Sequence, residues 1–361
     1  MLERNIDLNG SRVLVTGAAG FIGANLVMEL VKRYPGIRVL GIDNLNPYYD
    51  VRIKNYRLDK IAECVTGDDQ FELIRGDIAD RDLIDRIFRE FEPQVVVNLA
   101  AQAGVRNSID NPDAYIETNL VGFYNIIEAC RHSYDAGSED YKGVEHLVYA
   151  SSSSIYGDNK KIPYSVEDKV DNPVSLYAAT KKSNELMAHA YSKLYGIPST
   201  GLRFFTVYGP AGRPDMAYFG FTNKLISNET IKIFNYGNCR RDFTFVSDIV
   251  EGVLNVMAVA PSENEHGVRY SLYNIGNNDP VGLLDFVDIL QQELVSAGVL
   301  PGDFDFESHR ELVPMQPGDV EVTCADVSAL ERDFGFRPST SLREGLKAFA
   351  KWYKEFYRID V

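Results

Sequence analysis

A glycine-rich turn between a short apolar run and a helical pattern restricts the possible folds of this chain more than any other feature. Residues 12–16 (RVLVT) have the composition of a buried strand, and the segment GAAGFIG joins them to a helical pattern over 24–33. This order of strand, tight turn and helix is the context that a dinucleotide-binding turn requires. Gly17 permits the turn, Gly20 lets the backbone approach a diphosphate, and Gly23 lets the helix pack closely.

Carboxylates accompany the next two strand patterns. The run at 38–42 ends in Asp43, which can accept hydrogen bonds from both hydroxyls of an adenosine ribose and would repel a 2′-phosphate. We therefore expect NAD rather than NADP. The strand pattern at 71–78 contains Asp77, which can meet the adenine amino group. The polar and aromatic residues 44–57 predict a loop folded over the mouth of the site.

The first part of the chain continues this alternation of strands and helices. Strand patterns occur at 94–101 and 146–150, with a helical pattern at 115–132 between them. Such alternation predicts an α/β fold built on a Rossmann-type, doubly wound parallel sheet, with ligands at the carboxyl ends of its strands.

The second part of the chain breaks the alternation, although residues 270–275 (YSLYNI) have the pattern of a strand that returns to the sheet. We therefore predict two lobes that are interleaved in the sequence, with the site between them. The NAD-binding domain comprises residues 1–203 and 241–276, and a smaller α/β substrate-binding lobe comprises residues 204–240 and 277–361.

Tyr177 and Lys181 lie four residues apart in a helical pattern that ends at Tyr195, with Gly196 as its expected C-cap. Side chains at this spacing share one face of a helix. A phenol has a pKa near ~10, and an adjacent cation stabilises its anion, so the pair is a candidate base. By itself the pair occurs by chance in many helices. Support comes from the serine run 151–154, whose hydroxyls follow a strand and emerge at the carboxyl edge of the sheet.

Composition excludes several classes of partner. The net charge of -15 and the pI near 4.9 argue against a nucleic acid, which demands a basic face. The four cysteines have no metal-binding spacing, so we expect free thiols in a reducing cytosol and no metal. The absence of a signal-like start and of an apolar run of about 18 residues predicts a cytoplasmic protein without membrane spans. Residues 131–143 predict an exposed loop without a chemical role.

Longer motifs give the chain a specific resemblance. They are AQAGVR at 101–106, SLYAATKK at 175–182, RFFTVYGP at 203–210, GRPDM at 212–216, RRDF at 240–243 and MQPGDV at 315–320. Together with the glycine turn, they resemble the extended short-chain dehydrogenase/reductase superfamily and, within it, the UDP-glucuronate 4-epimerases. The chain departs from the family at Asn98, where histidine is usual, and in a longer insertion at 133–143.

The resemblance implies reversible C4 epimerisation of UDP-glucuronate to UDP-galacturonate through a transient 4-keto sugar, with tightly bound NAD. It assigns Tyr177 as the base, Lys181 as the cation that lowers the phenol pKa and holds the nicotinamide ribose, and Ser152 as the hydroxyl that orients the sugar oxygen. The implied cofactor contacts are Gly17, Gly20, Phe21, Ile22, Gly23, Asp43, Asn44, Asp77, Ile78, Leu99, Ala100, Ala101, Asn119, Ser151, Tyr177 and Lys181.

The substrate contacts implied by the same resemblance are Arg106, Ser152, Ser153, Ser154, Thr206, Arg213, Arg241 and Asp319. Arg241 is assigned to the diphosphate, because a guanidinium pairs well with phosphate. Asp319 is assigned to a uridine ribose hydroxyl or to the orientation of Arg241. Arg213 and the hydroxyls are assigned to the sugar carboxylate.

Several alternatives share the oxidation step. UDP-glucose or UDP-N-acetylglucosamine 4-epimerase and UDP-glucuronate decarboxylase stay open, whereas a 4,6-dehydratase would need an acidic pair where Ser153 and Ser154 stand. A catalytically silent NAD-binding regulator is the alternative from another class. The helices expected at 112–132 and 174–195 resemble those of a four-helix homodimer interface, which would bury positions such as Tyr124 and Leu194.

Overall fold

A seven-stranded sheet forms the centre of the computed structural model, which describes residues 1–67, 69–135, 140–315 and 320–359. The strand order is β10-β6-β5-β4-β1-β2-β3, and all neighbours are parallel. The strands are β1 (Arg12–Thr16), β2 (Arg38–Asp43), β3 (Phe71–Arg75), β4 (Val95–Asn98), β5 (His146–Ser152), β6 (Ser199–Phe204) and β10 (Tyr270–Ile275). The predicted doubly wound sheet is confirmed, and β10 is the strand expected to return to it.

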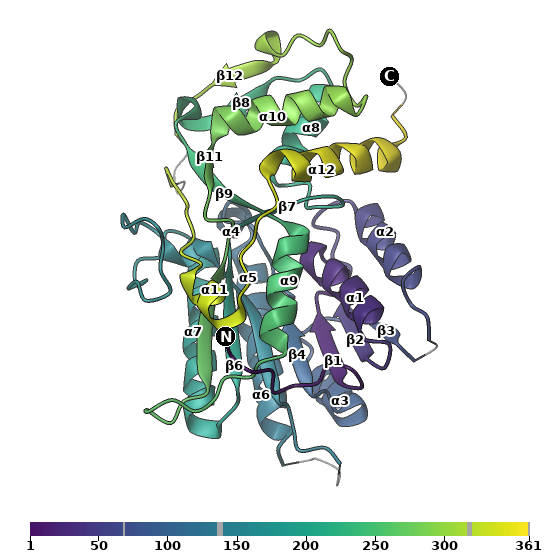
Figure 1. Ribbon diagram of the computed structural model, residues 1–361, viewed down its shortest axis with the longest axis vertical. Coiled ribbons are helices and arrows are strands. Elements are labelled where there is room, and N and C mark those ends of the chain that lie inside the picture. The colour runs from purple at the N-terminus through teal and green to yellow at the C-terminus, as the bar shows by residue number, and fades with distance from the viewer. Residues whose placement is uncertain (68, 136–139, 316–319, 360–361) are drawn as a thin grey trace.

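Helices cover both faces of this sheet (Figure 1). They are α1 (Phe21–Arg33), α2 (Val51–Ala62), α3 (Arg81–Phe91), α4 (Asn107–Asp110), α5 (Pro112–Tyr115), the π-helix η1 (Ile116–Gly122), α6 (Phe123–His132), α7 (Leu176–Tyr195) and α9 (Val246–Met257). Val15 and Val97 enter the core beneath α1 and α9, whereas Leu14 and Val96 enter the core beneath α3 and α6. Adjacent strand residues are therefore buried on opposite faces, which explains the continuous apolar runs in the sequence.

Two helix boundaries follow from local chemistry. Gly196 ends α7 in the left-handed conformation at φ 71°, as the sequence predicted. The prediction of a loop over 44–57 was wrong for residues 51–57, which form the first half of α2. The carboxylate of Asp50 accepts a hydrogen bond from the backbone N–H of Arg52, and this N-cap starts the helix earlier than the polar composition suggested.

The second lobe lies above the sheet in Figure 1 and has a core of its own. Its elements are β7 (Thr206–Tyr208), α8 (Ala217–Ile226), β8 (Ile231–Ile233), η3 (Phe234–Gly237), β9 (Arg240–Phe245), β11 (Pro280–Gly282), α10 (Leu283–Ser296), η4 (Glu307–His309), β12 (Arg310–Leu312) and α12 (Leu342–Tyr357). Aromatic rings fill this core: Phe243 stacks on Phe286 at 4.6 Å, and Tyr218 meets Phe349 edge-on at 4.7 Å.

Two segments cross the division into lobes that the sequence suggested. β9 pairs with β7 and β11 in a separate three-stranded sheet. Helix α11 (Ser328–Phe334), from the expected second lobe, packs on the first: its Phe334 meets Tyr273 of β10 at 5.1 Å between ring centroids. These contacts do not fix where one domain ends and the other begins, so the domain boundaries at 203, 240 and 276 stay a prediction.

The segment expected to be an exposed loop at 131–143 is partly anchored. Tyr141 is 5% exposed, and its hydroxyl donates a hydrogen bond to the carbonyl of Pro93. Residues 136–139, which form the middle of the predicted loop, lie outside the described residues. Residues 131 and 132, which were also expected in the loop, belong to α6, and Tyr141 lies near the amino end of β4, away from the edge expected to bind ligands.

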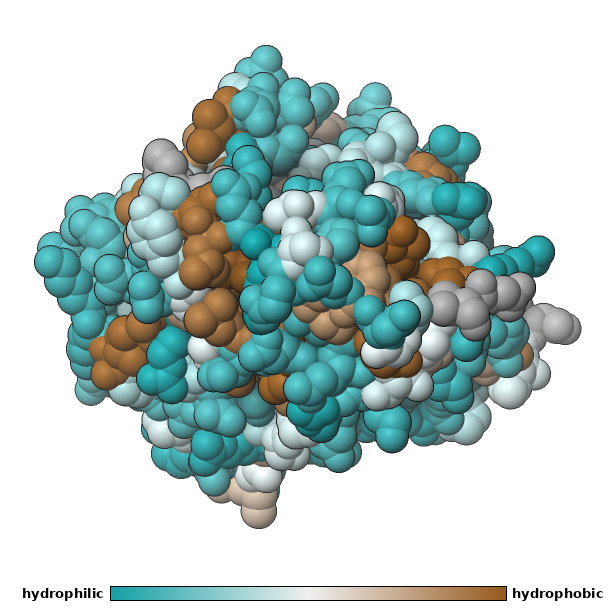
Figure 2. All heavy atoms as spheres, turned by 90° about the horizontal axis from the view of Figure 1, so that it is seen from above, coloured by the Kyte–Doolittle hydropathy of each residue, from teal (hydrophilic) through white to brown (hydrophobic). Residues whose placement is uncertain are grey.

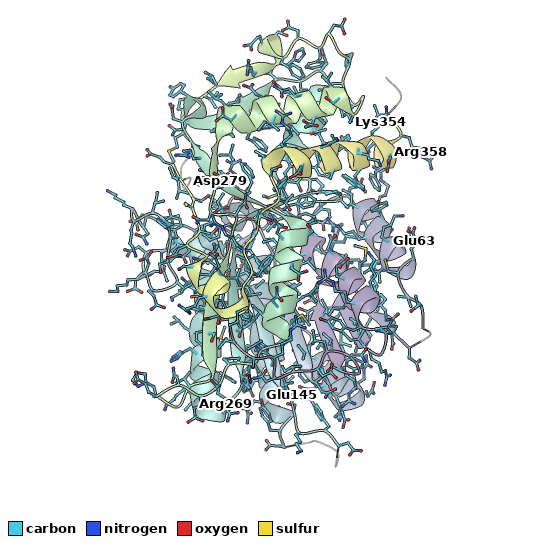
Figure 3. All side chains as sticks on the ribbon, in the orientation of Figure 1. Glu63, Glu145, Arg269, Asp279, Lys354 and Arg358 are labelled. Atoms are coloured by element: carbon cyan, nitrogen blue, oxygen red, sulfur yellow. The ribbon has the colours of Figure 1, made fainter. Side chains whose placement is uncertain are left out.

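Several charged side chains lie at the periphery of the molecule. Glu63, Glu145 and Arg358 project from the outer surface in Figure 3. Seen from the end formed by the second lobe, hydrophobic residues form patches separated by hydrophilic surface (Figure 2). None of the helices in the described part of the chain is both long and apolar enough to cross a membrane.

Candidate active site

Tyr177 stands in the first turn of α7, next to the loop that follows β4. The hydroxyl of Ser175 caps this helix by accepting a hydrogen bond from the N–H of Ala178 at 3.1 Å. The ring of Tyr177 meets that of Tyr115 edge-on, with 6.1 Å between centroids. Tyr115 is itself fixed, because its hydroxyl donates to the carbonyl oxygens of Ala103 and Gly104 at 2.9 and 2.6 Å. The candidate base is therefore held by packing as well as by its helix.

Opposing influences act on the phenol of Tyr177. Burial raises its pKa above the ordinary value, whereas a hydrogen bond with Ser152 and the charge of Arg213 lower the pKa. The charge of Asp215 raises it further. Ser152 ends β5, and its hydroxyl accepts the N–H of Ser154 at 3.1 Å. The structure thus brings together Ser152 and Tyr177, which are separated by 25 positions in the sequence.

Lys181 is fixed beneath this pair. Its side chain is buried, and its Nζ donates a hydrogen bond to the carbonyl oxygen of Ala150 at 2.9 Å. Desolvation lowers the pKa of its ammonium to about 8. The charge of Arg213 lowers the phenol pKa, and the same role assigned to Lys181 from the sequence stays a prediction.

A buried ion pair supports the strand end and the helix, and sequence analysis missed it. Glu185 and Arg203 meet at 2.8 Å, with side chains that are each 1% exposed. Ser151, predicted to contact the cofactor, donates its hydroxyl to the same carboxylate at 2.8 Å. Glu185 follows Lys181 by four residues, so the shared helix face was a signal that could have found it.

The glycine turn fits the diphosphate of a dinucleotide. A Cβ at Gly17 would lie 2.9 Å from the backbone nitrogen of Ala100, and one at Gly23 would lie 2.1 Å from the carbonyl oxygen of Gly17. Neither position tolerates a side chain. No side chain caps α1 at Gly20, so the first N–H groups of this helix are oriented for an anion. Phe21 and Ile22 open the helix, and Leu99, Ala100 and Ala101 follow β4 beside the turn.

Asp43 is more constrained than the sequence suggested. It is 7% exposed, and its carboxylate accepts the N–H groups of Ala19 and Leu45 at 3.1 and 2.8 Å. Lys54 of α2 adds an ion pair at 3.2 Å. A carboxylate offers about four acceptor positions, so about one is left for a ribose hydroxyl. Sequence analysis missed Lys54, which lies on the first turn of a helix that was expected to be a loop.

The other predicted cofactor residues form a hydrogen-bonded rim. Asn44 donates to the carboxylate of Asp77 at 2.8 Å, and Ile78 beside it is buried. Asn119 of η1 accepts the N–H of Gln102 at 2.8 Å and donates to Thr180 of α7 at 3.1 Å. Its amide therefore ties the loop after β4 to the helix that carries Tyr177.

Arg213 approaches the phenol from the second lobe, paired with a neighbour. Its Nε and Nη2 donate to the carboxylate of Asp215 at 3.0 and 2.5 Å, and the two side chains are 24% and 29% exposed. Tyr48, from the loop before α2, donates to the same carboxylate at 3.4 Å. Burial, reinforced by the charge of Asp215, raises the pKa of Tyr48 to about 12. The loop of residues 44–50 thus reaches across to the second lobe.

The remaining predicted substrate residues lie on different elements. Ser153 and Ser154 form the first residues of the 3-10 helix η2 (Ser153–Tyr156), and Thr206 begins β7. The guanidinium of Arg106 lies over the ring of Phe234 at 5.3 Å. Arg241 donates to the carbonyl oxygen of Glu321 at 3.0 Å. Asp319 lies outside the described residues, so its predicted role has no structural test.

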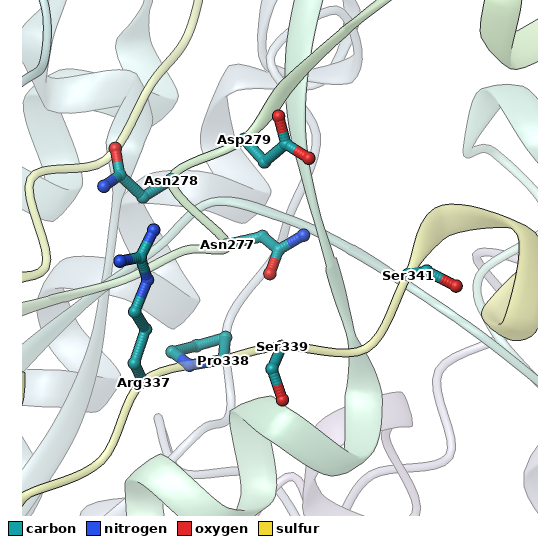
Figure 4. A pocket seen from close by; sticks show the side chains of 7 residues that line it. All are labelled: Asn277, Asn278, Asp279, Arg337, Pro338, Ser339 and Ser341. Carbon is teal, nitrogen blue, oxygen red and sulfur yellow. The ribbon is translucent and has the colours of Figure 1, made fainter.

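A separate surface pocket has none of these residues in its lining. It holds about 500 Å³ and lies between the turn after β10 and the segment before α12 (Figure 4). Its lining residues are Asn277, Asn278, Asp279, Arg337, Pro338, Ser339 and Ser341. Within the described part of the chain, no group of three or more His, Cys, Asp or Glu side chains is arranged to hold a metal ion.

Comparisons with known proteins agree with this geometry. A family model described as the NAD dependent epimerase/dehydratase family matches residues 13–276. The chain is 44% identical over 358 residues to Protein CapI of Staphylococcus aureus, covering 96% of this chain and 99% of that protein. It is 41% identical over 360 residues to UDP-glucuronate 4-epimerase 2 of Arabidopsis thaliana, covering 97% of this chain and 77% of that protein. A similar solved structure is that of UDP-glucuronic acid 4-epimerase of Bacillus cereus in complex with UDP-glucuronic acid and NAD. The TM-score is 0.80 at 30% sequence identity, and the match covers 96% of this chain and 100% of that chain.

Proposed function

The chain belongs to the NAD dependent epimerase/dehydratase family, and from that premise we propose that it interconverts UDP-glucuronate and UDP-galacturonate at C4 with NAD as cofactor. The observation that carries the proposal is the meeting of three groups at the carboxyl edge of the sheet. These are the hydroxyl of Ser152 at the end of β5, the phenol of Tyr177 and the charge of Arg213. A Cβ at Gly104 would lie 3.7 Å from Nη2 of Arg213 and 3.6 Å from the hydroxyl of Tyr115, the residue whose ring packs on Tyr177. In the proposed reaction Ser152 and Tyr177 orient and deprotonate a sugar hydroxyl, and Arg213 binds the sugar carboxylate.

In this mechanism Tyr177 removes the proton from O4 and later returns it, while Ser152 holds the same oxygen by a hydrogen bond. Lys181 holds the ribose next to the reacting ring. Bound NAD would supply a reversible hydride acceptor for C4, so the net reaction would consume no cofactor. Burial raises the pKa of Tyr177, and positive charge near the phenol favours the phenolate.

Retention of the sugar carboxylate is the second task of the site. A 4-keto uronate is a β-keto acid, and it loses carbon dioxide when the C5–C6 bond aligns with the ketone π system. We propose that Arg213, with the hydroxyls of Ser153, Ser154 and Thr206, holds the carboxylate out of this alignment. Arg241 is proposed for the diphosphate, because a guanidinium forms paired hydrogen bonds with phosphate.

We further propose that two copies pair through α6 and α7. Large apolar side chains lie exposed on these helices: Tyr124 at 39%, Leu186 at 60% and Leu194 at 69%. Their burial against a second copy would remove apolar surface from water. Light scattering on the purified protein should give the mass of a dimer at micromolar concentration, and Leu194→Glu with Leu186→Glu should give a monomer.

We also propose a cytosolic location, which suits the free thiols of the four cysteines.

The direct test is to incubate the pure protein with UDP-glucuronate and to follow all products by chromatography and NMR. We expect UDP-galacturonate without carbon dioxide or a UDP-pentose. Release of carbon dioxide as the main reaction would make the protein a decarboxylase. An equal kcat/KM for UDP-glucose or UDP-N-acetylglucosamine would make it an epimerase of neutral sugars as well. No turnover with bound NAD and intact Tyr177 would identify a silent regulator.

A further inference from the structure

Arg57 of α2 is a buried charge that the proposed reaction does not use. The residue is 1% exposed and ranks among the largest fully buried side chains of the protein. Among the residues that the structure describes, no carboxylate forms an ion pair with it. Burial of a guanidinium without an ion pair costs free energy unless its N–H donors are hydrogen-bonded. The acceptors of the Arg57 hydrogen bonds therefore indicate the role of the residue.

All the hydrogen bonds of Arg57 go to neutral oxygens in three separate segments. Nη1 donates to the carbonyl oxygen of Ala19 at 3.0 Å and to the hydroxyl of Tyr49 at 2.7 Å. Nε and Nη2 donate to the carbonyl oxygen of Ala211 at 2.9 and 2.6 Å, and Nη2 also donates to that of Gly212 at 3.1 Å. Ala19 lies in the glycine turn, and Ala211 and Gly212 directly precede Arg213. One side chain therefore bridges the cofactor turn and the second lobe.

The backbone that Arg57 holds has an unfavourable conformation. Ala211 has φ 50°, in the left-handed region that disfavours residues with a Cβ. Gly212 has no room for a side chain, because a Cβ there would lie 1.7 Å from the hydroxyl oxygen of Tyr218. The segment is thus clamped between Arg57 and Tyr218. If the clamp is removed, the backbone can relax and carry Arg213 with it.

We propose that Arg57 is a positioning residue that couples the two ligands: by fixing the glycine turn to residues 211–212, it makes cofactor binding and nucleotide-sugar binding stabilise each other. The inference rests on the proposed function for the identity of the two ligands, but not on turnover. A cofactor diphosphate at the N-terminus of α1 also brings negative charge towards the buried guanidinium, which already lies 5.8 Å from the ring of Phe21 in that helix. Coupling of this kind is reciprocal, so it is measurable from either ligand.

The experiment measures the rate of NAD release from the holoenzyme, with and without saturating UDP-glucuronate. We expect the sugar nucleotide to slow release about tenfold in the natural protein, as for a typical coupling between sites. Arg57→Lys keeps the charge but loses the planar fork, and Arg57→Met loses both, so the ratio of the two rates should fall towards one in each variant. KM for UDP-glucuronate should rise more than kcat falls.

Two matched variants control for damage to α2. Arg52→Met changes a side chain of the same helix that is 74% exposed and pairs with Asp50, so its ratio should equal that of the natural protein. Tyr49→Phe removes one acceptor of Nη1 but leaves the bridge from Ala19 to Ala211, so its ratio should change less than about twofold. If Arg57→Met does not fold, Arg57→Lys decides the outcome.

The inference and the proposed function fail in different ways. An unchanged ratio in Arg57→Lys, or a ratio of one in the natural protein, would overturn the coupling even if the protein epimerises UDP-glucuronate. Arg57-dependent slowing of NAD release without any epimerisation would leave the coupling intact and remove the assigned reaction.

Discussion

The two sides of the candidate site hold their polar groups differently. On the sheet side, Asp43, Asn119 and Glu185 are each less than 9% exposed and are hydrogen-bonded by partners from other elements. On the side of the second lobe, Arg213 and Arg241 lie on partly exposed segments and contact a neighbouring carboxylate or backbone carbonyls. Buried, fully bonded groups are rigid, whereas exposed groups can readjust. We therefore propose that the sheet side determines the chemistry and that the second lobe determines which sugar is accepted.

The strongest test of the sheet side is Tyr177→Phe, which removes the proton acceptor and leaves the ring that packs on Tyr115. We expect turnover to fall by roughly 10²–10⁴-fold, as for loss of a general base, with NAD still bound. Turnover assays and the cofactor content of the purified variant check this. If activity stayed within tenfold of the natural protein, the base would have to be sought elsewhere.

Rigidity on the sheet side predicts a large loss of stability when its buried ion pair is broken. Arg203→Met removes the buried partner of the Glu185 carboxylate and leaves it only Lys182 at 3.3 Å and the Ser151 hydroxyl at 2.8 Å. We therefore expect a loss of about 3 kcal/mol in the free energy of unfolding, at the lower end of the range for a broken buried pair. The matched variant in the second lobe is Arg310→Met, where the partners Asp288 and Glu307 are 53% and 78% exposed and the expected loss is below about 1 kcal/mol. Urea denaturation measures both. Equal losses would contradict the contrast between the two sides.

The same contrast explains what the sequence could predict. The glycine turn was predictable because its constraint is local: Gly17 and Gly23 have no space for a Cβ in a strand, turn and helix that are contiguous in the chain. The bridge from Arg57 to Ala211 spans 154 positions, and nothing near Arg57 in the sequence indicates its partner. Strands of the second lobe are short and pair across long separations in the sequence, as β9 does with β11. No apolar run in the sequence therefore predicts these strands.

A more moderate effect is expected on the side of the second lobe, from Arg213→Ala. Loss of one charged hydrogen-bond donor to a ligand costs about 1.5–3 kcal/mol, so kcat/KM for UDP-glucuronate should fall by roughly 10- to 100-fold. UDP-glucose, which has no carboxylate, should lose much less. Kinetics with both sugars and an assay for carbon dioxide check this, since a loosened carboxylate can reach the alignment that decarboxylation needs. Equal losses for the two sugars, without carbon dioxide, would show that Arg213 does not bind the carboxylate.

The substitution with the smallest expected effect is Asp215→Asn. It tests whether charges of the second lobe change the pKa of the phenol on the sheet side. The charge of Asp215 raises the pKa of the Tyr177 phenol and that of Arg213 lowers it, although the pair belongs to the second lobe. Neutralising Asp215 leaves the charge of Arg213 unopposed, so the phenolate forms at lower pH. The acid limb of the kcat/KM profile should therefore move to lower pH in Asp215→Asn and to higher pH in Arg213→Ala. Because the pair is partly exposed and screened, we expect kcat/KM at the plateau to change less than about tenfold in Asp215→Asn. Shifts in the same direction for the two variants would mean that the Arg213–Asp215 pair acts on the base through its packing and not through its charge.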